Sequence, residues 1–274
     1  APGVVGPFGG AIACGRLMGL SADRLTHALG VAGSLGGGLL AFSKAGQGGM
    51  VKRLHMGRAA EAGVLAAQLA GGGYEGPETV LDGAYGMLDA FCNERDVTRL
   101  TADLGTKWLT ETLALKSFAC HVTAHAPVHM LVALMRQHAF AGGDIAALTL
   151  RVSDKVLSHH ASRNPTDIMQ VQYSVPYTVA LAAHRDPAKP ASFSADAITD
   201  SDIRRLAELI VLEPAAKNAG KRAATDIAVT LRDGRHFEDS AESFPGCQDQ
   251  PFSAGQLKDK FRALAAGGAA DTEA

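Results

Sequence analysis

Several features that mark particular protein classes are scarce in this 274-residue sequence. Its four cysteines are widely separated and form no CxxC pair, which argues against a zinc ribbon and against a disulfide-stapled secreted domain. The formal net charge of −2 provides no long-range field that would attract nucleic acid or an anionic membrane. No apolar run is long enough to span a bilayer, and no signal-peptide pattern opens the chain. We therefore expect a cytoplasmic protein that has neither nucleic acid nor a membrane as its partner.

Hydrophobic sequence, in contrast, is ample for folded cores. Hydrophobic residues make up 47% of the chain and charged residues 20%, which is typical of an enzyme with one large domain or two modest ones. The first residue is Ala1 rather than methionine, so we expect the chain to begin part-way through a longer protein.

The N-terminal part is typical of helices joined by short turns. Apolar positions among alanines predict a helix over residues 8–20, and Ser21 is placed to cap the next helix. Glycines at 30, 33 and 36–38 follow. A dinucleotide-binding loop would need a strand before them, whereas the helical pattern there favours close helix packing, with a nucleotide-binding module as the alternative. Further helices are predicted from about Leu54 to Gly71 and from Gly76 to about Gly86.

A cationic cluster stands where the long helix is predicted to begin. It contains Lys52, Arg53, His55 and Arg58. Positive charge at a helix N-terminus is unfavourable unless an anion compensates it. The cluster therefore indicates a carboxylate or phosphate ligand, with a solvated basic turn as the alternative.

A second polar cluster lies in residues 115–129, which contain a lysine, a cysteine, a threonine and three histidines. Pro127 suits the first turn of a helix, and this places His121 and His125 near a helix N-terminus that favours an anion. The four-residue spacing of His121, His125 and His129 makes a metal site the competing interpretation. Because Pro127 interrupts a continuous helix and no carboxylate lies nearby, we expect no metal.

Beyond His138 the pattern changes from helix to an α+β arrangement. Residues 145–152 and 227–231 alternate as strands do, Asp233-Gly234 is a hairpin turn, and residues 235–239 return as the partner strand. His159 and His160 fall in a polar loop and are interpreted as solvent-facing. Helices are predicted over residues 173–183, 203–211 and 256–266, followed by a tail at 267–274.

Taken in order, these segments resemble the MmgE/PrpD superfamily, which includes 2-methylcitrate dehydratase, cis-aconitate decarboxylase and iminodisuccinate epimerase. The resemblance is carried by residues 30–34, 52–60, 76–77, 81–83, 116–125, 172–177, 233–234 and 260–261. It implies a mainly α fold plus an α+β part. We expect a partial all-helical domain over residues 1–112 with its N-terminal portion absent, an α+β lid domain over 113–245, and a C-terminal helix and tail over 246–274. A homodimer is also implied.

The same resemblance implies catalytic roles for Lys52, His121, His125 and Tyr173. We expect substrate contacts from Arg53, His55, Lys116 and Arg163. These residue types suit carbanion chemistry beside a carboxylate, since a cation can hold the acid, an imidazole changes charge near neutral pH, and a phenol can protonate a leaving hydroxyl.

We therefore predict a cofactor-independent hydro-lyase that resembles 2-methylcitrate dehydratase and acts on a small di- or tricarboxylate. Epimerisation and decarboxylation use similar parts and stay open. A catalytically incomplete fragment with a binding or assembly role is also open, because part of the family's site is absent. Decarboxylase members show a Phe-Pro-Ala-His pattern where residues 118–121 read Phe-Ala-Cys-His.

Overall fold

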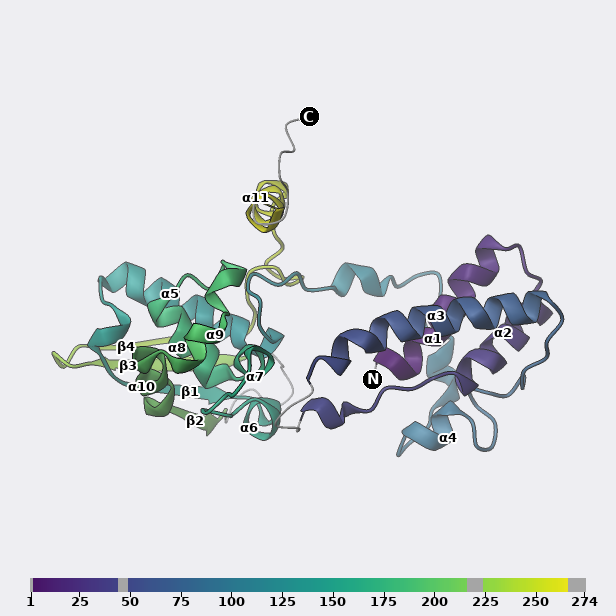
Figure 1. Cartoon of the computed structure of the whole chain (residues 1–274), viewed down its shortest axis with the longest axis horizontal. Helices are drawn as coiled ribbons and strands as arrows, with labels where there is room; N and C mark the ends of the chain where they lie inside the picture. Colours follow the sequence, from purple (N-terminus) through teal and green to yellow (C-terminus); the bar gives the residue numbers. More distant parts are fainter. Residues whose placement is uncertain (1, 44–48, 216–223, 266–274) are drawn as a thin grey trace. The chain divides into compact units, whose positions relative to one another are not determined.

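The computed structural model describes residues 2–43, 49–215 and 224–265, which form two compact units with a boundary between Lys107 and Trp108 (Figure 1). The first unit is helical, and the described part of the second unit combines helices with a four-stranded sheet. The expected fold class, a helical part followed by an α+β part, is confirmed. The tail predicted at 267–274 lies outside the described residues. None of the described helices is both long and apolar enough to cross a bilayer.

Three helices form the core of the first unit, namely α1 (Pro2–Leu17), α2 (Ala22–Ser34) and α3 (Val51–Gly71). Ser21 caps α2 as predicted, because its Oγ accepts a hydrogen bond from the backbone N–H of Arg24 at 3.3 Å. The unit also contains η1 (Leu40–Ser43), α4 (Met87–Phe91) and η2 (Val97–Leu100). The prediction of a helix over residues 76–86 is wrong. These residues form turns closed by backbone hydrogen bonds such as that from Met87 N to Val80 O, and α4 begins after them.

Small residues allow the helices of the first unit to approach closely. A Cβ atom on Gly63 in α3 would lie 2.6 Å from the Cα atom of Gly10 in α1. A Cβ atom on Gly30 would lie 2.6 Å from the carbonyl carbon of Gly76. Because Gly30 lies within α2 and not in a loop after a strand, the close-packing interpretation of this glycine is confirmed.

Replacing Gly63 by alanine should lower the free energy of unfolding by about 1–3 kcal/mol, because the added methyl group forces α1 and α3 apart. Gly57→Ala is the matched control, since it lies in the same helix and its Cβ would meet nothing within 4 Å. This control should be neutral or slightly stabilising. Urea denaturation of both variants measures the difference, and equal stabilities would contradict tight packing at Gly63.

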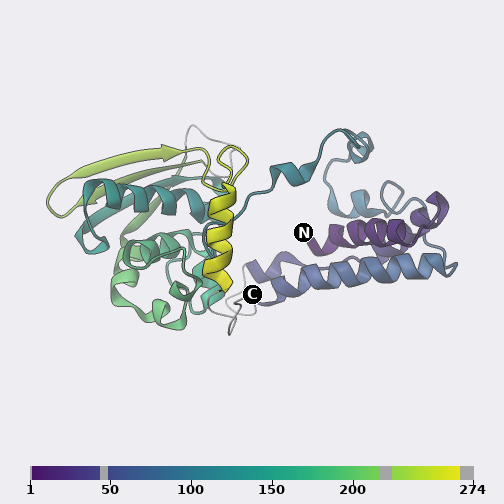
Figure 2. The same cartoon turned by 90° about the horizontal axis from the view of Figure 1, so that it is seen from above.

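The second unit is built on a sheet with strand order β2-β1-β3-β4. Its strands are β1 (Ile145–Val152), β2 (Ile210–Pro214), β3 (Thr225–Leu231) and β4 (His236–Ala241). Strand β1 pairs with β2 in parallel and with β3 antiparallel, and β3 pairs with β4 antiparallel. One face is buried by helices: α5 packs on β3 and β4, and α10 packs on β1 and β2. Figure 2 shows the strands as a layer along one side of these helices.

The helices of this unit lie mainly between β1 and β2 in the chain. The α-helices are α5 (His125–His138), α6 (Asp154–His159), α7 (Ile168–Tyr173), α8 (Val175–His184), α9 (Ala195–Thr199), α10 (Ser201–Leu209) and α11 (Ala254–Ala265). Short 3-10 turns are η3 (Leu109–Thr112), η4 (Val122–Ala124), η5 (Gly142–Asp144) and η6 (Pro190–Ser192). The strand at 145–152, the hairpin and the last helix are confirmed.

Two predicted elements of this unit are wrong in detail. The amphipathic helix expected to reach Val211 ends at Leu209, and Ile210 begins β2 because it pairs with Leu148 of β1. The single helix expected over residues 173–183 is two helices. Ser174 breaks it, because its Oγ accepts the backbone N–H of Tyr177 at 3.0 Å and so caps α8. Tyr173 therefore ends α7 and does not share a helix with Tyr177.

Candidate functional site

His121 sits at the entry to α5, where its backbone is extended and η4 begins. Its Nδ1 atom accepts a hydrogen bond from the backbone N–H of Thr123 at 3.4 Å and lies 2.9 Å from the Thr123 hydroxyl. Since a backbone N–H can only donate, Nδ1 is the acceptor nitrogen of the ring. Neutral His121 therefore carries its proton on Nε2, and that edge of the imidazole is a hydrogen-bond donor.

Two further rings complete a cluster around His121. The imidazole of His160 stacks on that of His121, with ring centroids 4.0 Å apart and planes at 27°. The Tyr173 ring lies 5.3 Å from His121 and 5.7 Å from His160. His160 is held in place because its Nδ1 lies 3.0 Å from the carbonyl oxygen of Tyr173. The structure therefore brings together His121 and Tyr173 of the predicted site, and it adds His160.

Sequence reasoning missed His160. Its neighbour His159 is exposed, as predicted for the polar loop, whereas His160 is buried. No local sequence pattern distinguishes the two, since His159 is the last residue of α6 and His160 follows it directly. The fold makes the distinction: the N–H of Val175 donates to the carbonyl oxygen of His160 at 2.9 Å and ties the loop to α8. The N–H of His121 likewise donates to the Gln172 carbonyl at 2.7 Å, which ties His121 to α7.

Lys116 and Arg163 were predicted to contact substrate. The Lys116 side chain is exposed, and its ammonium group donates to the carbonyl oxygen of Cys120 at 2.8 Å, so the side chain lies along the segment that leads to His121. The Arg163 guanidinium donates to the carbonyl oxygen of Ile210 from Nε at 3.2 Å and from a terminal nitrogen at 2.8 Å. Arg163 therefore anchors the start of β2, and its contact with substrate stays a prediction.

His125 lies inside the second unit and is fully buried. Its Nε2 atom accepts the backbone N–H of Phe118 at 3.4 Å, and its Nδ1 atom lies 3.3 Å from the His121 carbonyl oxygen. Burial lowers the pKa of His125 to about 4, so the ring is neutral near neutral pH. His125 is thus placed to hold the main chain of His121. A catalytic role for His125 stays a prediction.

Two other titratable side chains near His125, those of Cys120 and His129, are also neutral near neutral pH. Burial raises the pKa of the Cys120 thiol to about 12, which suits a packing residue and not a nucleophile. Burial lowers the pKa of His129 to about 4, and its Nε2 lies 2.9 Å from the Ser117 hydroxyl. Within residues 2–43, 49–215 and 224–265, no group of three or more His, Cys, Asp or Glu side chains is arranged to hold a metal ion.

The cationic cluster lies in the first unit. Helix α3 begins at Val51, three residues before the predicted start, so its first turns contain Lys52, Arg53 and His55. Lys52 and His55 are half-buried and Arg53 is exposed. The catalytic role expected of Lys52 and the substrate contacts expected of Arg53 and His55 stay predictions.

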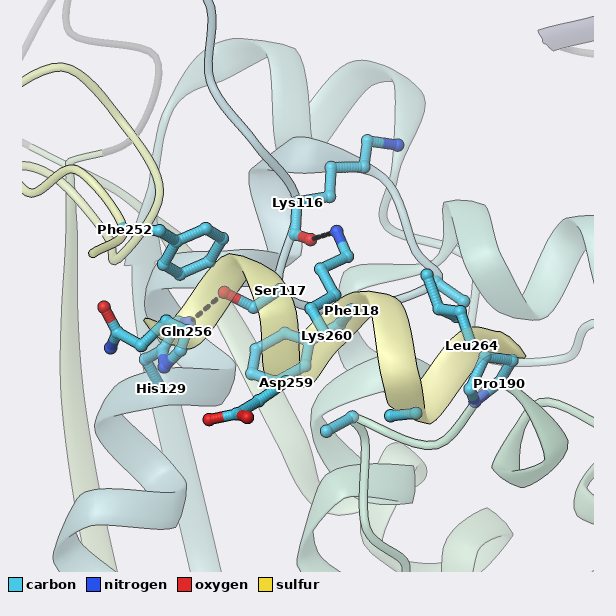
Figure 3. Close-up of a pocket in the computed structure, with 13 residues that line it drawn as sticks. Lys116, Ser117, Phe118, His129, Pro190, Phe252, Gln256, Asp259, Lys260 and Leu264 are labelled. Atoms are coloured by element: carbon cyan, nitrogen blue, oxygen red, sulfur yellow. Dashed lines mark hydrogen bonds between the residues drawn. The ribbon is translucent and has the colours of Figure 1, made fainter. Parts of the chain in front are cut away.

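A cavity of about 580 Å³ lies beside residues 116–119 in the second unit. It is lined by these residues, by His129, and by side chains of α11 and the turn before it, including Phe252, Gln256, Asp259 and Lys260. Figure 3 shows the Lys260 ammonium directed at the main chain of Lys116, whose own ammonium points away from the other lining side chains. The two lysines therefore have different partners, since Lys260 donates to the Lys116 carbonyl oxygen and Lys116 donates to the Cys120 carbonyl oxygen.

Comparison with known proteins identifies the family. The MmgE/PrpD N-terminal domain matches residues 1–100, and the MmgE/PrpD C-terminal domain matches residues 118–274. The chain is 28% identical to a cis-aconitate decarboxylase of Mus musculus and 29% identical to one of Homo sapiens, in each case over 96% of this chain and 55% of the relative. A cis-aconitate decarboxylase of Aspergillus terreus is 39% identical over 49% of this chain and 28% of its own length. The chain thus spans about half the length of the mouse and human relatives. With both of its units matched by these domains, the chain belongs to the MmgE/PrpD family.

Proposed function

We propose that the full-length protein is a cofactor-independent lyase that decarboxylates a small unsaturated tricarboxylate similar to cis-aconitate. The dehydration of 2-methylcitrate expected from the sequence is the alternative. The relatives reported above carry the name cis-aconitate decarboxylase, and this favours loss of CO₂ over loss of water. The stacked cluster of His121, His160 and Tyr173 is the observation that carries the proposal.

Loss of CO₂ from a carboxylate leaves an electron pair on carbon, and that carbon must then be protonated. A donor held at the right place supplies the proton and stabilises the charge that develops. Neutral His121 presents Nε2–H, because its Nδ1 is used at the entry to α5. In this proposal His121 donates as the imidazolium: a second proton taken up from water sits on Nδ1 and faces the Thr123 hydroxyl 2.9 Å away, the Nε2 proton goes to the carbon, and a neutral ring remains. The Tyr173 hydroxyl donates a hydrogen bond to a substrate oxygen.

The remaining carboxylates of the substrate need cations. Lys116 lies in the same segment as His121, and we assign it to one carboxylate. Lys52 is assigned to a second carboxylate, with Arg53 and His55 beside it in α3. His125 is assigned to positioning, because its Nδ1 faces the His121 carbonyl. The homodimer and the cytoplasmic location stay predictions.

A panel of acids tests this function. The full-length protein is incubated with cis-aconitate, citrate, 2-methylcitrate and aspartate-derived acids, and the reactions are followed by proton NMR and by release of labelled CO₂. We expect cis-aconitate alone to lose a carboxyl group. Conversion of 2-methylcitrate without CO₂ release would replace decarboxylation by dehydration. Conversion of none of the acids would favour a binding or assembly role.

A further inference from the structure

The segment that carries Lys116 is held by a turn more than a hundred residues away in the sequence. The N–H of Leu115 donates to the carbonyl oxygen of Gly246 at 2.7 Å. The Ser117 hydroxyl donates to the carbonyl oxygen of Pro245 at 3.1 Å. These two bonds flank Lys116, so the turn fixes the main chain on both sides of that lysine.

Gly246 is required by the geometry of this contact. Its φ is +104°, a conformation that favours glycine, and a Cβ atom there would lie 2.1 Å from the carbonyl oxygen of Leu115. The turn is also anchored. The N–H of Gly246 donates to the Gln250 carbonyl at 2.7 Å, and the buried ring of Phe244 lies 5.1 Å from the ring of His125. The turn is therefore an ordered support for the segment.

Lys260 of α11 provides a third connection. Its ammonium group donates to the carbonyl oxygen of Lys116 itself (Figure 3). No side chain of α11 is buried, so the fold of the unit does not depend on the core packing of this helix. The contact thus joins an exposed helix to the backbone of the lysine that we assign to the substrate.

A fourth connection comes from α5. The carbonyl oxygen of Pro245 can only accept, so the Ser117 hydroxyl donates to it and can accept a hydrogen bond from His129 Nε2, which lies 2.9 Å away. Because the pKa of His129 is lowered to about 4 by burial, the neutral ring keeps one N–H, and this contact places it on Nε2. Ser117 therefore links α5 to the same turn.

We propose that Gly246, Lys260 and Ser117 are positioning residues that fix Lys116 for binding a substrate carboxylate. The inference rests on the proposed function of Lys116. A lysine side chain is long and flexible, so the direction of its ammonium group depends on how firmly its backbone is held. Misplacement of a binding group by about 1 Å can reduce activity by roughly a hundredfold.

Lys260 gives the sharper test, because its substitution leaves the core untouched. Lys260→Met removes the donor and keeps the length of the side chain, whereas Lys260→Arg keeps a donor. Lys258→Met is the matched control, since Lys258 is exposed on the same helix. The probe is propane-1,2,3-tricarboxylate, a saturated acid without a hydroxyl group, titrated into the full-length protein by calorimetry. We expect Lys260→Met to weaken binding about tenfold. The arginine variant and the control should stay within about twofold of the wild type.

Hydrogen exchange of the Leu115 amide supplies a readout that does not depend on the substrate. Gly246→Ala should remove the protection of this amide and weaken binding of the probe by about tenfold or more. Retained protection in Gly246→Ala, or unchanged binding in Lys260→Met, would overturn the inference. If the wild type does not bind the probe, the proposed function of Lys116 fails. Exchange at Leu115 then still decides whether the turn holds the segment.

Discussion

Replacing His121 by asparagine should reduce kcat/KM of the full-length enzyme by about 10²–10⁴-fold, the contribution expected of a positioned proton donor. Asparagine is chosen because its side-chain oxygen can take the place of Nδ1 and still accept the N–H of Thr123 at the entry to α5. The variant should therefore keep its thermal stability. It loses Nε2–H, so the limb of the pH dependence of kcat/KM that reports His121 should disappear.

His159→Gln is the matched control, because His159 is an exposed histidine next to the cluster in sequence. This variant should keep wild-type kinetics and pH dependence. A second comparison is His121→Gln, whose amide reaches the position of Nε2 but no longer caps the turn. It should lose stability as well as rate. If His121→Asn keeps kcat/KM within about threefold of the wild type, His121 is not the proton donor.

The elements that could be predicted from the sequence are those specified by local chemistry. Ser21 is a capping residue before an apolar helical pattern, and it caps α2. Apolar and polar residues alternate over residues 145–152, which is the pattern of a strand with one buried face, and β1 has these bounds. Asp233-Gly234 forms the predicted turn because Gly234 takes a φ of +88°. The placement of His121 at a helix entry was predictable for the same reason, since Pro127 restricts where α5 can begin.

The features that were missed depend on partners distant in the sequence. Ile210 continues an amphipathic helical pattern, and only pairing with Leu148 makes it a strand residue. His160 cannot be distinguished from its neighbour His159 by the local sequence, and it joins the site through contacts of its carbonyl oxygen with Val175 and of its ring with Tyr173. The Ser117 hydroxyl donates to the carbonyl oxygen of Pro245, which is 128 residues away in the sequence. Periodicity and capping rules carry no information about such contacts, so this part of the site required the three-dimensional structure.

Acidification should destabilise the second unit, and His125 should account for a large part of this loss. Its Nε2 faces the N–H of Phe118, so a proton on Nε2 would place two donors against each other. The pKa of His125 is lowered by burial from 6.5 to about 4 in the folded state. The unfolded chain therefore binds more protons between these two pH values, and the free energy of unfolding falls as the pH decreases from about 6.5 to about 4. A shift of this size corresponds to roughly 3 kcal/mol.

The measurement is urea denaturation across this pH range for the wild type and for His125→Asn. The variant should be less stable near neutral pH, because it loses buried contacts, yet its stability should depend less steeply on pH. The free energy of unfolding is plotted against pH for both proteins, and the difference between their slopes gives the contribution of His125 alone. The contributions of His129, whose pKa is also lowered to about 4, and of carboxylates that titrate in the same range are common to both proteins. Parallel profiles for the wild type and the variant would mean that His125 is not the acid-sensitive group. Since Nδ1 of His125 faces the His121 carbonyl, loss of activity should accompany the loss of stability in the wild type.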